Sequence, residues 1–151
     1  MLYACSYPEN ADHVLTRLSE EPDLLSTKCK DAFTFLTHCN AGSDAFEFDV
    51  VVINGRVHAG SSVKDQIQID DGDVVNELNL WGCLRIKHTK TPVVAIVSLG
   101  ETFKKMDRIQ DPALDMKYRM DTSPEQVDES IIFTLEKFFP KRFTRRDSCG
   151  S

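Results

Sequence analysis

The sequence predicts an α+β protein with a mainly antiparallel sheet of four or five strands and helices at both ends of the chain. Residues 46–53 and 92–98 are rich in β-branched and other apolar side chains, a pattern typical of central strands buried on both faces. In residues 74–87 the even-numbered positions are mostly apolar and the odd-numbered positions are mixed polar and apolar, which indicates a strand with one buried face. Helical spacing of apolar residues occurs before and after this run of strands, so helices and sheet are expected to be segregated.

Two helices are expected before the sheet. The first covers residues 8–20, because Pro8 suits the first helical position, apolar side chains follow at helical spacing, and Pro22 ends the segment. The second covers residues 27–39, with Ser26 as its N-terminal cap. Both helices would place an apolar stripe against the sheet.

The first central strand is expected to end in a tight turn. Asn54-Gly55 favours such a turn because both residue types tolerate positive φ, so we expect a hairpin in which the chain returns from Val57. A second turn is expected at Asp71-Gly72, directly before the strand of residues 74–87. Only Asn76 interrupts the apolar even-numbered face of that strand, so this face is expected to pack on the core.

Two or three helices are expected after the strand of residues 92–98. Residues 101–110 carry apolar side chains at helical spacing, and residues 113–120 suggest a further short helix beyond the break at Asp111-Pro112. The last helix has the strongest start signal. Ser123-Pro124-Glu125-Gln126 supplies a cap, a first-position proline and a capping-box glutamine.

Length and charge predict one acidic domain with a basic tail. Residues 1–140 suit a single globular domain, and residues 141–151 are polar and expected to be disordered. The formal net charge is -6, and removing the four tail cations leaves -10 for the rest of the chain. An acidic body repels phosphate backbones, so nucleic acid is expected as a partner only if the tail binds it. The tail could also serve as a nuclear address; its cations are Lys141, Arg142, Arg145 and Arg146.

The cysteines and the hydropathy pattern indicate a location inside the cell. An odd number of cysteines without close pairs argues against a disulfide framework, and free thiols suit a reducing compartment. The N-terminus lacks a secretory signal, and no apolar run is long enough to span a bilayer. We therefore expect a cytoplasmic, or nuclear, protein with no membrane contact. The cysteines are Cys5, Cys29, Cys39, Cys83 and Cys149.

The leading functional hypothesis is a non-enzymatic protein-interaction or regulatory module, such as an adaptor, an inhibitor or an immunity-type protein. No catalytic set stands out, and neither a cofactor nor a bound metal is expected. The odd-numbered face of residues 74–87 would present a mixed polar and apolar patch around Trp81, and an exposed Trp is a common interface anchor. The partner would be another protein, with a homodimer through the sheet as one possibility. The predicted interaction residues are Trp81, Cys83, Glu77, Asn79 and Arg85.

The alternative hypothesis is a metal-dependent hydrolase or nuclease. Asp70, Asp73 and Glu77 form a dense group of carboxylates, which are the hard oxygen ligands that divalent metals prefer. Glu77-Leu78-Asn79 loosely resembles the Glu-x-Lys element of PD-(D/E)xK-type nucleases, although Asn79 replaces the lysine. The resemblance implies metal-assisted cleavage of nucleic acid, whereas the simpler interpretation of the same residues is a solvated turn.

Overall fold

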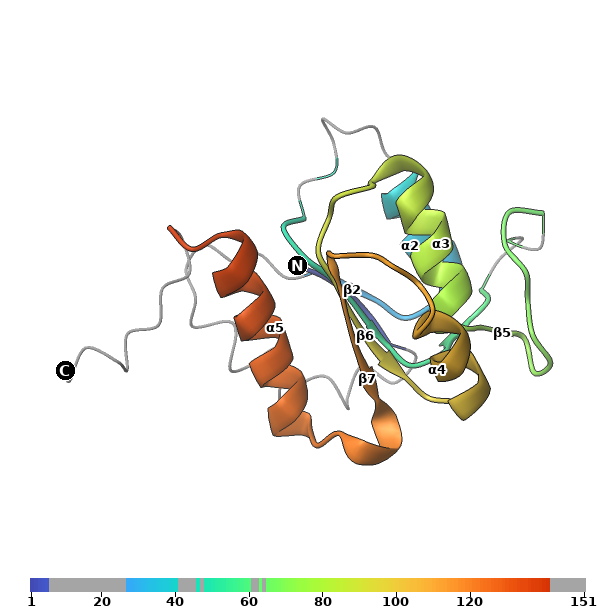
Figure 1. Ribbon diagram of the computed structural model, residues 1–151. Helices are drawn as coiled ribbons and strands as arrows, with labels where there is room; N and C mark the ends of the chain where they lie inside the picture. Colours follow the sequence, from blue (N-terminus) through green and yellow to red (C-terminus); the bar gives the residue numbers. More distant parts are fainter. Residues whose placement is uncertain (6–26, 41–45, 47, 61–62, 64, 142–151) are drawn as a thin grey trace.

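The computed structural model describes residues 1–5, 27–40, 46, 48–60, 63 and 65–141. Its centre is a five-stranded sheet in the order β2-β1-β3-β6-β7, in which every neighbouring pair is parallel (Figure 1). The strands are β1 (Leu2–Ala4), β2 (Thr27–Cys29), β3 (Val51–Asn54), β6 (Val93–Val97) and β7 (Leu114–Tyr118).

The expectation of a mainly antiparallel sheet is therefore wrong. The two apolar runs do form buried strands, since every residue of β3 and β6 is buried. Strands that are buried along their whole length need cover on both faces, and parallel sheets with helices on both sides provide that cover. The apolar runs were thus a signal for a parallel sheet, which the apparent alternation of residues 74–87 obscured.

The antiparallel pairing among the described strands is confined to a short ladder of β4 (Val57–His58) and β5 (Val74–Val75). The chain does turn at Gly55, which has a φ of 84°. However, β4 does not return along β3, because β1 and β6 already occupy both edges of β3. The expected hairpin is wrong for this reason.

Helices cover both faces of the sheet (Figure 1). Because side chains alternate along a strand, Val51 and Ile53 face one helical layer and Val52 faces the other. Buried apolar side chains fill the space between the sheet and each layer. The layers are α2 (Ala32–Cys39), α3 (Glu77–Lys87) and α4 (Gly100–Met106) on the first face, and α5 (Pro124–Phe138) on the second.

Residues 27–39, expected as one helix, form a strand and a shorter helix. β2 pairs with β1, and α2 begins after Asp31, whose side chain accepts a hydrogen bond from the backbone N–H of Thr34 at 2.8 Å. A three-residue strand is too short to show a period of two, so the sequence pattern missed it. The expected helix of residues 8–20 and the expected cap Ser26 lie outside the described residues.

Residues 74–87, expected as a long strand, form β5 followed by helix α3, so that expectation is also wrong. The side chain of Asn76 caps the helix by accepting from the backbone N–H of Asn79 at 2.9 Å. The buried residues are Glu77, Leu80 and Leu84, spaced three and four apart as on one helical face. The two leucines fit both the strand period of two and the helical period of about 3.6. Glu77 is charged, so the sequence did not indicate that it is the third buried residue of the helical face.

Replacing Gly82 with alanine tests this helix directly. The residue lies inside α3, and an added Cβ would meet no atom within 4 Å. Alanine favours a helix interior over glycine by about 0.8–1.0 kcal/mol, so the free energy of unfolding in urea should rise. Gly72→Ala is the matched control: its surroundings are equally open but its φ is 87°, so stability should fall. A loss of stability in Gly82→Ala would argue against the helix.

In the C-terminal third, two of the three expected helices are confirmed and one is wrong. The helix expected over residues 101–110 is α4, which ends at Met106. Within residues 113–120, expected as a helix, Leu114–Tyr118 form β7 at the edge of the sheet, and a 3-10 helix over Arg119–Asp121 follows it. Helix α5 is confirmed together with its capping box. The Ser123 hydroxyl accepts from the N–H of Gln126 at 3.3 Å, and the Gln126 side-chain oxygen accepts from the N–H of Ser123 at 2.7 Å.

The described part of the chain ends at Lys141, which is exposed. The other tail cations, Arg142, Arg145 and Arg146, lie outside it, so docking of the tail on nucleic acid stays a prediction. None of the helices among the described residues has the length and apolar character needed to cross a membrane.

Candidate functional site

The carboxyl ends of the parallel strands carry a group of polar residues. In a doubly wound sheet, ligands bind beyond these ends, near the point where the strand order reverses. Here that point lies between β1 and β3. A cavity of about 450 Å³ opens at this edge. Its lining residues are Cys5, Asn54, Gly55, Arg56, His58, Asp71, Gly72, Val74, Ser98 and Arg119.

Asn54 is held from both ends of its side-chain amide. Its Nδ2 donates to the hydroxyl of Tyr3 at 2.6 Å, and the Arg119 guanidinium donates to its Oδ1. Burial, the largest effect, raises the pKa of Tyr3 to about 12, so this hydroxyl stays protonated. A Cβ on Gly55 would lie 2.8 Å from a guanidinium nitrogen of Arg119, so the glycine makes room for the contact. The amide therefore serves as a structural link between β1, β3 and the turn after β7.

Ser98, which follows β6, is bonded to Glu77 at the start of α3. Its backbone N–H and its hydroxyl both donate to Glu77 Oε2, at 2.7 and 2.9 Å. Glu77 is fully buried. The hydroxyl of Ser98 is therefore engaged with a carboxyl group. This contact ties the carboxyl end of β6 to the N-terminus of α3.

The three carboxylates of the metal hypothesis do not come together. Asp70 accepts from Asn76 Nδ2 at 2.9 Å, Asp73 stands in a turn with a φ of 56°, and Glu77 is bonded to Ser98. Across the part of the chain that the structure describes, no group of three or more His, Cys, Asp or Glu side chains could hold a metal ion.

The predicted interaction residues lie on helix α3 and do not share one outward face. Trp81 is partly buried between the core and α4, and its Nε1 donates to Asp111 Oδ2 at 2.8 Å. Arg85 donates to the same oxygen at 2.8 Å. Asn79 donates its side-chain amide to the carbonyl of Gln68 at 3.5 Å. Whether these side chains contact a partner stays a prediction.

Two further groups on this side have shifted pKa values. Burial raises the pKa of the Cys83 thiol, so at neutral pH the thiolate nucleophile is suppressed. The pKa of Asp111 is lowered. Burial alone would raise it, but hydrogen bonds from Arg85, Trp81 and the N–H of Ala113 outweigh burial, and the net pKa lies below the ordinary value. Asp111 is therefore a charged anchor for α3.

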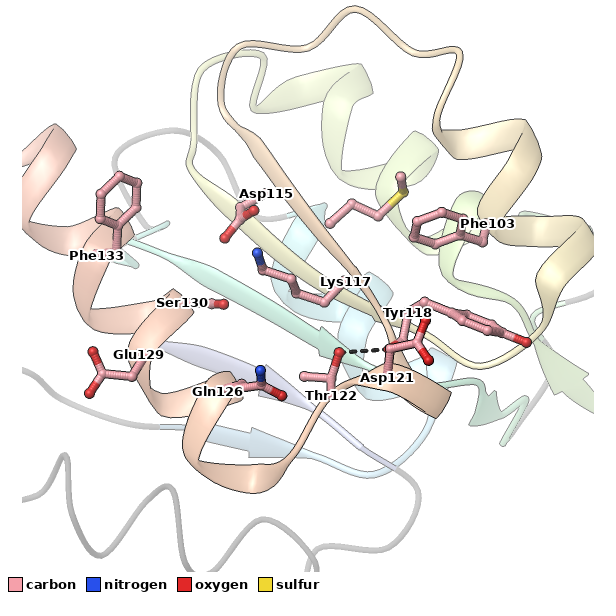
Figure 2. A pocket seen from close by; sticks show the side chains of 11 residues that line it. Phe103, Asp115, Lys117, Tyr118, Asp121, Thr122, Gln126, Glu129, Ser130 and Phe133 are labelled. Carbon is pink, nitrogen blue, oxygen red and sulfur yellow. Dashed lines mark hydrogen bonds between the residues drawn. The ribbon is translucent and has the colours of Figure 1, made fainter.

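A groove of about 640 Å³ runs along the open edge of β7 (Figure 2). Asp115 and Lys117 lie on the side of β7 that faces α5, whereas Phe103 and Tyr118 lie on the other side. Sequence reasoning missed this groove because residues 113–120 were expected to be helical. We call it the edge groove; it is lined by Phe103, Asp115, Met116, Lys117, Tyr118, Asp121, Thr122, Gln126, Glu129, Ser130 and Phe133.

The edge groove combines apolar and charged side chains. Phe133 on α5 is 59% exposed, so a large aromatic side chain lies open to solvent beside the charged residues of the groove. A second, smaller cavity shares Asp115 and Phe133 with the groove and extends it to Phe138 near the end of α5. The open space therefore follows the whole length of β7.

The fold is of the flavodoxin-like, doubly wound class, whose strand order is 2-1-3-4-5. Among solved structures, the chain is similar to the receiver domain of NtrX from Brucella abortus, with a TM-score of 0.59, 19% identity, and coverage of 89% of this chain and 97% of that one. It is also similar to the receiver domain of the Francisella response regulator 1452, with a TM-score of 0.59, 20% identity, and coverage of 93% and 96%. These similarities establish the fold and agree with the correction to a parallel sheet. Neither a protein-family model nor a curated protein matches the sequence.

Proposed function

We propose that this chain is a regulatory module that works by binding another protein and catalyses no reaction of its own. One observation carries the proposal: the side-chain amide of Asn54, which lines the cavity at the carboxyl ends of the strands, is hydrogen-bonded at both ends, to Tyr3 and to Arg119. The two structural neighbours are named as receiver domains, and one of them as part of a response regulator. A regulatory role for this chain is consistent with the fold it shares with them.

The chemistry of the cavity supports a structural role for these polar groups. A nucleophile needs an adjacent base, and a general base needs a free position next to substrate. Asn54 is neither acid nor base. Glu77, which accepts from the Ser98 hydroxyl, is fully buried and also accepts from the Ser98 backbone N–H, as a structural contact does. Asn54 and Ser98 thus connect strands and helices to one another.

The edge groove is the surface that we propose for the contact with a partner. Protein interfaces combine an aromatic or apolar centre with a polar rim. Phe103, Met116 and Phe133 supply the apolar part, and Asp115 and Lys117 supply charges of both signs. An adaptor or an inhibitor needs only such a contact surface, so either role fits.

A photo-crosslinking amino acid at position 133 tests the proposal. Introduced into the full chain in its native cells, it should form covalent adducts with a protein after irradiation. The matched control is position 33, because Phe33 is a 45% exposed phenylalanine on α2, on the opposite face of the sheet. We expect adducts at least several-fold stronger from position 133, identified by mass spectrometry.

The outcomes separate clearly. Adducts from position 133 and not from position 33 support a protein partner at the edge groove. An absence of protein adducts at position 133, or equal labelling at both positions, contradicts the proposal.

A further inference from the structure

Among the residues that the structure describes, no strand pairs with the outer edge of β7. β7 is the last strand of the sheet, with β6 as its neighbour on the other side. The N–H of Val93 donates to the carbonyl of Ala113, so Ala113 directs its backbone groups at β6. Successive residues of a strand direct these groups to opposite edges, so Leu114, Met116 and Tyr118 direct theirs at the edge groove.

Contacts within the chain satisfy two of these outward groups. The N–H of Leu114 donates to the carbonyl of Asp111 at 3.2 Å, and the carbonyl of Tyr118 accepts from the Thr122 hydroxyl at 2.6 Å (Figure 2). The carbonyl of Leu114, the N–H of Tyr118 and both backbone groups of Met116 are directed at the groove. An open strand edge of this kind is a template for pairing with another strand.

We propose that the edge groove binds β7 of a second copy of this chain, in antiparallel pairing about a twofold axis through Met116. This inference rests on the proposed function and names the partner at the groove. In such a pairing the two Met116 residues exchange both of their hydrogen bonds, and the N–H of Tyr118 donates to the carbonyl of Leu114 of the second copy. The groups that the fold leaves open are the ones that this pairing uses.

The charged side chains of β7 match in this arrangement. Asp115 lies opposite Lys117 of the second copy, and symmetry produces the same pair a second time. These are the positions where opposing side chains approach most closely, so opposite charges there stabilise the pairing. An axis through Asp115 would instead place Asp115 opposite Asp115 of the second copy. An axis through Lys117 would place Lys117 opposite Lys117 of the second copy. The charges therefore select the register centred on Met116.

The other face of the paired strands is apolar. Leu114 lies opposite Tyr118 of the second copy, and the two Met116 side chains meet at the axis. Both types of pair contribute to sheet stability through side-chain contact. On the charged face, the 59% exposed ring of Phe133 stands beside the groove, where a second copy would cover it.

Two charge-reversal variants test the proposal. Lys117→Asp and Asp115→Lys each place like charges opposite one another in both symmetric pairs. Each variant alone should therefore self-associate at least about tenfold more weakly than the wild-type chain. Mixed in equal amounts, the two variants again place Asp opposite Lys at every pair, so they should form a mixed dimer. Sedimentation velocity over a concentration series, with one variant fluorescently labelled, measures both results.

Lys90→Asp is the control, because it makes the same charge change at an exposed position outside the groove and should leave association unchanged. Circular dichroism and the Tm of each variant establish that it is folded. The double variant Asp115→Lys/Lys117→Asp, which restores opposite charges in one chain, should dimerise like the wild type.

If the wild-type chain stays monomeric at high concentration, the proposal is overturned. Lys117 would then be a charged residue that prevents the edge strand from pairing with another chain. Single variants that dimerise normally, or a mixture that stays monomeric, overturn it as well. The proposed function is judged separately. If dimerisation fails but the crosslinker at position 133 captures a different protein, that function stands without the homodimer.

Discussion

Replacing Asp111 with alanine is expected to lower the free energy of unfolding by about 3–5 kcal/mol. The carboxylate accepts three hydrogen bonds, from Arg85, Trp81 and the N–H of Ala113. The side chains of Arg85 and Asp111 are only 11% and 9% exposed. Removing the anion leaves a guanidinium without its charge partner in a nearly dry position, which is the costly way to break an ion pair. Urea unfolding at neutral pH measures the loss.

The same contact should show a characteristic pH dependence. The pKa of Asp111 in the folded chain lies below its ordinary value, because the hydrogen bonds outweigh the opposing effect of burial. A lowered folded-state pKa stabilises the folded chain above the unfolded-state pKa of about 3.9, and this contribution is lost as pH falls towards the folded-state pKa. The stability advantage of the wild type over Asp111→Asn should therefore be constant near neutral pH and shrink below about pH 4.

Asp107→Ala serves as the control, because Asp107 is exposed at the end of α4. It should change the free energy of unfolding by less than about 0.5 kcal/mol. A difference between the wild type and Asp111→Asn that stays constant down to pH 3 would contradict the ion pair as the source of the stability.

The elements that the sequence predicted correctly have strong local signals. Ser123 and Gln126 specify the start of α5 by their own hydrogen bonds. Val93 to Val97 form an apolar run bounded by a proline and a glycine, and this run is β6. In both cases the information lies within a few neighbouring residues, so it can be read without knowing the fold.

The errors occurred where the decisive contacts are distant in the sequence. Whether β3 has parallel or antiparallel neighbours depends on β1 and β6. Val51 of β3 pairs with Leu2, 49 positions before it, and with Val93, 42 positions after it. Asp111 was recognised only as part of a helix-breaking Asp-Pro pair, because its partners Trp81 and Arg85 are 30 and 26 positions away. The group formed by Asn54, Tyr3 and Arg119 was missed for the same reason.

The last prediction concerns Glu77, whose contact with Ser98 connects α3 to the carboxyl end of β6. Glu77→Ala is expected to lower the free energy of unfolding by about 3 kcal/mol, because it leaves a cavity and deprives the N–H of Ser98 of its acceptor. Glu77→Gln retains a side-chain oxygen for Ser98, so the loss should fall to about 1 kcal/mol.

Glu101→Ala removes an exposed carboxylate from the first turn of α4 and is the matched control, with an expected loss of less than about 0.5 kcal/mol. If Glu77→Ala were no more harmful than this control, the contact with Ser98 would not hold α3 to the sheet. The residue would then be free for the chemistry that its sequence neighbourhood first suggested. A large loss in Glu77→Ala that is mostly recovered in Glu77→Gln instead assigns the buried carboxyl to the scaffold, as the acceptor that holds the start of α3 against the carboxyl end of β6.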